Sequence, residues 1–214
     1  MKLAIIGTSH VAKILSAQRA HFPELAEQWD CYPVPNGLND GLGLSAIGLD
    51  RDNKRLTGFP GRGNMKRALD LTGYDAFVLV GGQSPPVALA MLKERTLSAS
   101  FREAAARDLL TRNNNLRLFR AIRSVSDAPV AVATCLMVAR GTPPKVETLE
   151  RAEAEIAEFW TGRGATFLPQ PRETLGPDML TRPDCQMGGG DNHLTTEAAV
   201  HQVRQIRDAM RVPA

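Results

Sequence analysis

The stretch IIGTSHVAKI, residues 5–14, joins an apolar run to a helix-like pattern through one short turn. Residues 2–6 predict a short buried strand, and residues 9–21 predict a helix with one apolar face. A strand that passes directly into a helix is typical of the first unit of an α/β fold. The turn between the two carries Ser9 and His10, so the residues that indicate the fold also raise the question of function.

Apolar runs and helical patterns alternate along the rest of the chain. The predicted strands are residues 2–6, 29–34, 44–49, 75–80, 129–133 and 165–168. The predicted helices are residues 9–21, 65–71, 98–124 (one helix, or two that meet near 113–115), 144–162 and 195–210. Because the strands are continuous apolar runs, we expect them to be buried on both faces. The sequence therefore predicts an α/β fold, a three-layer sandwich with a mainly parallel sheet, in one domain over residues 1–214.

The composition is ordinary for a soluble globular protein and excludes several classes of function. The net charge is +3, no basic run is present, and 5% of the residues are aromatic, so we expect no nucleic-acid partner. The apolar run before Gly7 is too short for a signal peptide, and no stretch is long enough to span a membrane. We therefore expect a cytoplasmic protein without a membrane partner. The cysteines, Cys31, Cys135 and Cys185, are odd in number and far apart, which predicts reduced thiols.

Polar residues follow several of the predicted strands, where an open parallel sheet binds its ligands. The turns concerned are GTSH at residues 7–10, GGQS at 81–84 and TC at 134–135. A fourth polar group, GDNH at residues 190–193, ends a long loop over 169–193 and precedes the last predicted helix. A loop of that length is functional or mobile rather than a simple connection. Three of these four groups carry side chains that acyl transfer requires.

Ser9 and His193 are the candidate nucleophile and base. A serine attacks a carbonyl only when a base takes its proton, and an imidazole needs a carboxylate to fix its tautomer. Asp191 is the candidate carboxylate, and Asp184 is a second one. Simpler interpretations stay open: Ser9 as a helix N-cap, and Asp191 with Asn192 as a turn before a helix.

An oxyanion site could be built around the same turn. The Gln83 amide, the backbone N–H of Ser9 and a loop glycine are candidate donors, although a plain polar turn or loop would explain the same residues. His10 adjoins Ser9 on the predicted helix and is badly placed to act as its base, so we expect it to face the substrate or to cap the helix. The candidate oxyanion and substrate-binding residues are Gln83, Gly82, Gly63, Gly61, His10 and Asn192. Neither a metal nor a cofactor is expected, because Asp191 and His193 have no further ligand cluster and no dinucleotide-binding glycine pattern is present.

The order of these blocks resembles that of the SGNH hydrolase superfamily, also called GDSL-like esterases, as a divergent bacterial member. Residues 7–10 resemble its first block, and residues 191–194, DNHL, resemble its last. Residues 81–84 match its Gly-x-Asn-Asp block in part, with Gln83 in place of the asparagine. The family aspartate usually stands three residues before the histidine, where this chain has Gly190. The resemblance implies a flavodoxin-like α/β/α sandwich.

The resemblance also implies a function. It implies a serine esterase or O-acyltransferase in which Ser9, His193 and Asp191 form a triad. The block GTSHV is similar to a form found in bacterial proteins linked to surface polysaccharides, which implies an O-acetylated sugar or polysaccharide, or another small acyl ester, as substrate. The departures at Gln83 and Gly190 leave a second hypothesis: a catalytically degenerate member that binds a glycan or a polysaccharide-processing partner.

Overall fold

The computed structural model describes residues 1–34, 43–59, 68–82, 86–139, 141–188 and 193–210. Within these ranges the main sheet consists of the parallel strands β1 (Leu3–Gly7), β2 (Trp29–Pro33), β6 (Ala76–Val80), β7 (Val130–Ala133) and β8 (Thr166–Leu168). Their spatial order is β2-β1-β6-β7-β8. Numbered along the chain, this is the order 2-1-3-4-5 of flavodoxin-like folds. The predicted fold class is confirmed.

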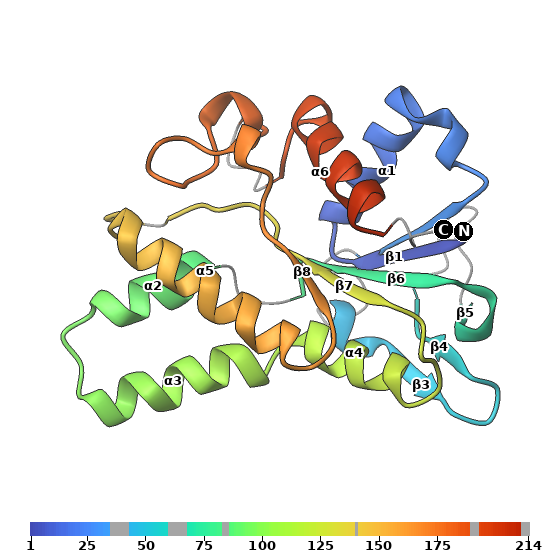
Figure 1. Ribbon diagram of the computed structural model, residues 1–214, viewed down its shortest axis with the longest axis horizontal. Helices are drawn as coiled ribbons and strands as arrows, with labels where there is room; N and C mark the ends of the chain where they lie inside the picture. The colour runs from blue at the N-terminus through green and yellow to red at the C-terminus, as the bar shows by residue number, and fades with distance from the viewer. Residues whose placement is uncertain (35–42, 60–67, 83–85, 140, 189–192, 211–214) are drawn as a thin grey trace.

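The alternation of side chains along the strands divides the core into two layers. Ile5 and Val78 lie in the layer beneath α1 (His10–His21) and α6 (Thr196–Ala209). Ile6 and Leu79 point to the opposite layer, which is covered by α2 (Pro86–Glu94), α4 (Asn114–Arg123) and α5 (Val146–Thr161). Figure 1 shows α1 and α6 side by side on one face of the sheet, with α4 and α5 on the other. Because both faces are covered, every residue of β1 and β6 is buried, which explains the unbroken apolar runs.

A small antiparallel sheet was not predicted. It contains β3 (Gly48–Asp50), β4 (Arg55–Thr57) and β5 (Ala68–Asp70). The predicted strand over 44–49 is wrong in its first part, because residues 43–46 form a 3₁₀ turn. The predicted helix over 65–71 is wrong for residues 68–70, and residues 65–67 lie outside the described ranges. Leu69 pairs with Leu56 and both are fully buried, so burial in the sheet outweighs local helix propensity.

The helices of the middle of the chain differ from the prediction in one respect. Helix α2 was missed because it begins at the second of two consecutive prolines, although a proline is tolerated in the first turn of a helix. Residues 98–124 form two helices, α3 (Ala99–Thr111) and α4, which confirms the second of the two predicted arrangements. The break is explained by Asn113, whose side-chain Oδ1 accepts a hydrogen bond from the N–H of Leu116 at 2.9 Å and so caps α4.

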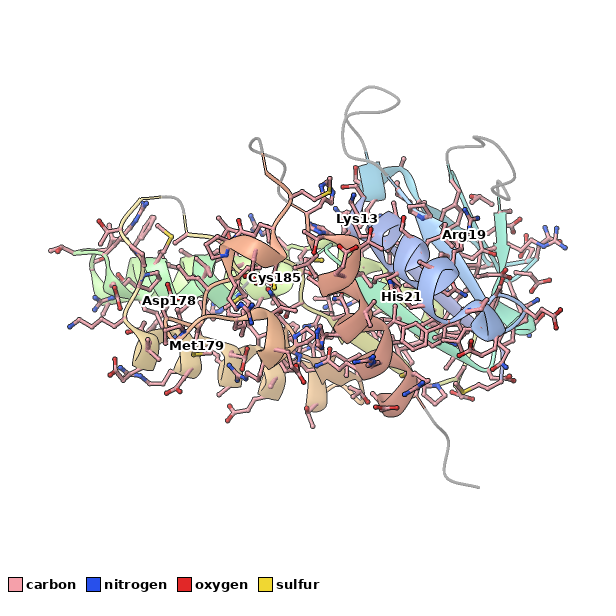
Figure 2. All side chains as sticks on the ribbon, turned by 90° about the horizontal axis from the view of Figure 1, so that it is seen from above. Lys13, Arg19, His21, Asp178, Met179 and Cys185 are labelled. Carbon is pink, nitrogen blue, oxygen red and sulfur yellow. The ribbon has the colours of Figure 1, made fainter. Side chains whose placement is uncertain are left out.

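The described part of the long C-terminal segment has regular turns and is hydrogen-bonded to the rest of the fold. It contains two 3₁₀ turns, Arg172–Thr174 and Pro183–Cys185. The N–H of Met137 donates to Gln170 Oε1 and to Thr181 Oγ1, both at 2.8 Å, which ties the segment to the loop after β7. Figure 2 shows Asp178 and Met179 at one end of the molecule and Cys185 beside α6. Over the described residues, no helix has the length and apolar character that a membrane crossing requires.

Candidate active site

Ser9 lies in the turn between β1 and α1, directly before the first residue of the helix. It occupies the N-cap position with helical dihedral angles, φ −52° and ψ −19°, and its side chain makes no capping hydrogen bond. Its Oγ instead lies 2.6 Å from Nε2 of His193. The two residues are 184 positions apart in the chain, so the contact is made by the fold. A serine hydroxyl in hydrogen-bond contact with an imidazole is the geometry of an activated nucleophile.

Gly7 makes the turn before Ser9 possible. A Cβ at this position would lie 2.1 Å from the carbonyl oxygen of Val80, at the end of the neighbouring strand. The N–H of Thr8 donates to the same carbonyl at 3.1 Å. The chain therefore passes against β6 with no room for a side chain, and this close approach fixes where Ser9 leaves the sheet.

Backbone hydrogen bonds at His193 and two residues after it fix the position of His193. Its carbonyl accepts a hydrogen bond from the N–H of Met187 at 2.9 Å, and the N–H of Thr195 donates to the carbonyl of Cys185 at 2.9 Å. The next residue, Leu194, is buried in a small cluster with Leu136, Cys185 and Ala198. The Thr195 hydroxyl accepts the N–H of Ala198 at 3.2 Å and caps α6. The imidazole is therefore presented at the start of a capped helix.

His10 contacts the other candidate histidine. Its ring centroid lies 4.7 Å from that of His193, with an angle of 50° between the ring planes. The Ser9 hydroxyl meets His193, in agreement with the argument that the residue adjacent to Ser9 is badly placed as its base. His10 therefore forms one wall beside the candidate base.

The turn after β6 brings three strand ends together. Gly81 has a φ of +74°, and a Cβ there would lie 2.3 Å from Thr8 Oγ1, 2.9 Å from Cys135 Sγ and 3.2 Å from His10 Cδ2. The carboxyl ends of β1, β6 and β7 thus converge at Gly81, as expected for a parallel sheet. Burial raises the pKa of the Cys135 thiol, so this sulfur stays protonated and is a weak nucleophile. All three cysteines are unpaired.

Asn115 is a residue that sequence analysis missed. The carbonyl of Gly82 accepts hydrogen bonds from the N–H groups of Asn114 at 2.9 Å and Asn115 at 3.3 Å. A Cβ at Gly82 would lie 2.3 Å from Asn115 Oδ1. The Asn115 side chain is fully buried, and among the described residues neither of its amide atoms has a hydrogen-bond partner. The one available signal is the run Asn113–Asn114–Asn115, since helix capping accounts for only the first of the three.

Asp184 has a local partner. It is exposed, and its Oδ1 accepts a hydrogen bond from Arg182 Nε at 3.0 Å, while its Oδ2 pairs with the Arg182 guanidinium. Hydrogen bonding to Arg182 lowers the pKa of the Asp184 carboxyl. This carboxylate therefore forms an ion pair with an arginine at the surface.

The remaining candidate residues lie outside the described ranges. They are Gln83, Gly61, Gly63, Asp191 and Asn192. Among the residues that the structure does describe, no three His, Cys, Asp or Glu side chains gather closely enough to hold a metal ion.

Solved structures show the class of fold. A GDSL-like lipase from Bacteroides thetaiotaomicron is similar with a TM-score of 0.51 at 11% identity, over 98% of this chain and 87% of its own. A proposed acylhydrolase from Bacteroides fragilis has a TM-score of 0.54 at 11% identity, over 98% and 86% of the two chains. The lipase Lip_vut3 from a goat rumen metagenome has a TM-score of 0.51 at 10% identity, over 98% and 97%.

The chain therefore has the SGNH, or GDSL-like, hydrolase fold. At 10% and 11% identity the likeness concerns the fold alone. No family model matches the sequence, and no curated protein matches it.

Proposed function

We propose that this protein is a serine-dependent esterase or O-acyltransferase that acts on an acyl ester. The observation that carries the proposal is the 2.6 Å contact between Ser9 Oγ and His193 Nε2, in a turn where the hydroxyl does not cap its helix. The fold supports the same chemistry, because similar structures are named as a lipase, a GDSL-like lipase and a proposed acylhydrolase.

The proposed reaction uses Ser9 as nucleophile and His193 as base and then acid. Ser9 Oγ attacks the acyl carbonyl while His193 Nε2 accepts the hydroxyl proton. The imidazolium then gives that proton to the leaving alkoxide, and the acyl group remains on Ser9 as an ester. Water or a second hydroxyl attacks this ester with the same proton transfers and releases the acid or the transfer product. We assign Asp191 the role of orienting His193, because Asp184 is paired with Arg182.

The proposed oxyanion site begins at the helix that carries Ser9. The first N–H groups of a helix have no intrahelical partner, and the helix dipole favours negative charge at this end. We therefore place the N–H of Ser9 in the site, together with the Gln83 amide and a loop glycine at position 61 or 63. Gly82, His10 and Asn192 are assigned to substrate contact beside it.

The proposed substrate class is an O-acylated sugar, with acetyl esters as the first to test. This assignment rests on the similarity of GTSHV, residues 7–11, to the block found in bacterial proteins linked to surface polysaccharides. The mechanism above requires only an acyl ester, so aryl acetates serve as general reporters of the chemistry.

Hydrolysis of p-nitrophenyl acetate tests the two central residues. We expect Ser9→Ala and His193→Ala each to lower kcat/KM at least about a thousandfold, because serine and base act as a unit. Two variants on the same helix are controls: Ser16→Ala, an exposed serine whose hydroxyl bonds to the carbonyl of Ala12, and His21→Ala, an exposed histidine seen on α1 in Figure 2. Both should retain the wild-type rate.

Two results would contradict the proposal. Wild-type-like activity in Ser9→Ala would remove this residue from the mechanism. Binding of a sugar without any turnover of acetyl esters would favour the second hypothesis, a degenerate protein that binds glycans.

A further inference from the structure

Helix α3 (Ala99–Thr111) is the least covered helix of the described chain. None of its residues is buried, whereas each of the other α-helices has at least four buried residues. Phe101 is 56% exposed, which is unusual for a large aromatic side chain. Figure 1 shows α3 running beside α2 and extending beyond the edge of the main sheet. An exposed aromatic on an uncovered helix marks a surface available for a partner.

A groove of about 650 Å³ lies between α2 and α3. Its wall on α2 includes Met91 and Leu92, and its wall on α3 includes Phe101, Ala105 and Leu109. Asp108 and Arg112 also line the α3 side, where Arg112 Nε and Asp108 Oδ1 are 3.2 Å apart. The groove is therefore an apolar surface with charged groups at its edge, which is the composition of a protein–protein contact.

The charged and apolar residues of α3 are arranged so that the helix matches a second copy of itself that runs in the opposite direction. Counting outward from Ala105 in both directions, position 102 is arginine where 108 is aspartate, and position 101 is phenylalanine where 109 is leucine. With about 100° per residue, positions 101, 102, 108 and 109 all lie within about 60° of Ala105 on the helix surface. Phe101, Asp108 and Leu109 line the groove, and Arg102 lies at the edge of that face, where it lines the neighbouring cavity of α3.

We propose that α3 is the contact between two copies of this chain, paired antiparallel about a two-fold axis at Ala105. A two-fold axis that passes midway between the two copies of Ala105, perpendicular to both helices, places each Arg102 at the level of the other copy's Asp108, and each Phe101 at the level of the other copy's Leu109. The small side chain of Ala105 at the axis allows the two helices to approach closely. A second copy is the partner that the observations favour, because the arginine and the aspartate of α3 stand at the positions where each meets the opposite charge on another α3.

The charge pairs make a strict test possible. Arg102→Asp leaves only carboxylates at positions 102 and 108, and Asp108→Arg leaves only guanidinium groups. Each variant alone therefore opposes like charges twice in the dimer, whereas a mixture of the two opposes unlike charges twice. The matched control is Arg107→Asp, the same exchange on the same helix at a position about 160° from Ala105, whereas Arg102 lies about 60° from it.

Sedimentation equilibrium of the full chain gives the readout. We expect a wild-type dimer that dissociates in the micromolar range, because a contact centred on one pair of helices buries a small surface area. Each single variant should raise the dimer dissociation constant at least about tenfold. An equimolar mixture of the two variants, and the double variant Arg102→Asp/Asp108→Arg, should both recover the wild-type constant, and Arg107→Asp should leave it unchanged.

Several outcomes would overturn the proposal. They are a wild-type protein that stays monomeric through the micromolar range, a dimer that the single variants do not weaken, a mixture that does not recover, and a control that weakens as much as Arg102→Asp. Far-UV circular dichroism of each variant excludes misfolding as the cause of a loss.

Discussion

At the scale of single residues, the Ser9 hydroxyl decides between two interpretations of the same sequence. A serine at a helix N-cap ordinarily accepts a hydrogen bond from an N–H in the first turn. The Ser9 hydroxyl makes no such bond and contacts His193 instead, whereas Asn113 at the start of α4 does cap its helix. The two caps therefore differ in what their side chains contribute to stability.

This difference predicts effects of different size on the free energy of unfolding. We expect Asn113→Ala to destabilise the protein by about 1–2 kcal/mol, because it removes a cap that holds the Leu116 N–H at 2.9 Å. We expect Ser9→Ala to change the unfolding free energy by less than about 0.5 kcal/mol, since no cap is lost. Urea unfolding measures both values. A Ser9→Ala cost equal to that of Asn113→Ala would contradict this prediction.

At the scale of elements, strands that are buried on both faces were the most predictable. Strands β6 and β7 are unbroken apolar runs, and every residue of both is buried as expected. The errors fall where tertiary contacts overrule the local pattern. Strand β5 has a helix-like sequence but is paired with β4 through Leu69 and Leu56. The proline pair at 85–86 concealed the start of α2, which begins at Pro86.

In the candidate site too, some residues could be predicted from the sequence, whereas others depend on tertiary contacts. The residues that follow apolar strands could be located from sequence, because the carboxyl ends of parallel strands meet at one edge of the sheet. Asn115 could not, because its place beside Gly82 depends on how α4 packs against the end of β6. The pairing of Asp184 with Arg182 likewise depends on the shape of a 3₁₀ turn.

The turn after β6 gives a prediction at this scale. Gly81 and Gly164 both have a φ of +74°, but a Cβ at Gly81 would strike Thr8 and Cys135, whereas a Cβ at Gly164 would have no atom within 4 Å. Each Gly→Ala change should cost about 1 kcal/mol or more of backbone strain. We expect only Gly81→Ala to lower p-nitrophenyl acetate turnover at least about tenfold, because it displaces the turn that carries Ser9. Equal turnover in the two variants would contradict this placement of the site.

At the scale of the whole molecule, the sheet brings together residues from the two ends of the chain. Helices α1 and α6 pack side by side on one face, so the turn before α1 and the loop before α6 open at the same edge. Gln202 of α6 donates to the carbonyl of Thr134 at 3.1 Å, which fixes α6 against the end of β7. Ser9 and His193 therefore meet because of the parallel topology, and the contact requires the complete fold.

Covalent labelling with a fluorophosphonate tests most directly whether Ser9 is an activated nucleophile. Intact-mass measurement of the wild-type chain should show a single adduct that peptide mapping places on Ser9. The adduct should be absent in Ser9→Ala and should form at least about a hundredfold more slowly in His193→Ala, because the base no longer takes the proton. A wild-type chain that is never labelled, or a Ser9→Ala variant labelled like the wild type, would contradict the proposed chemistry.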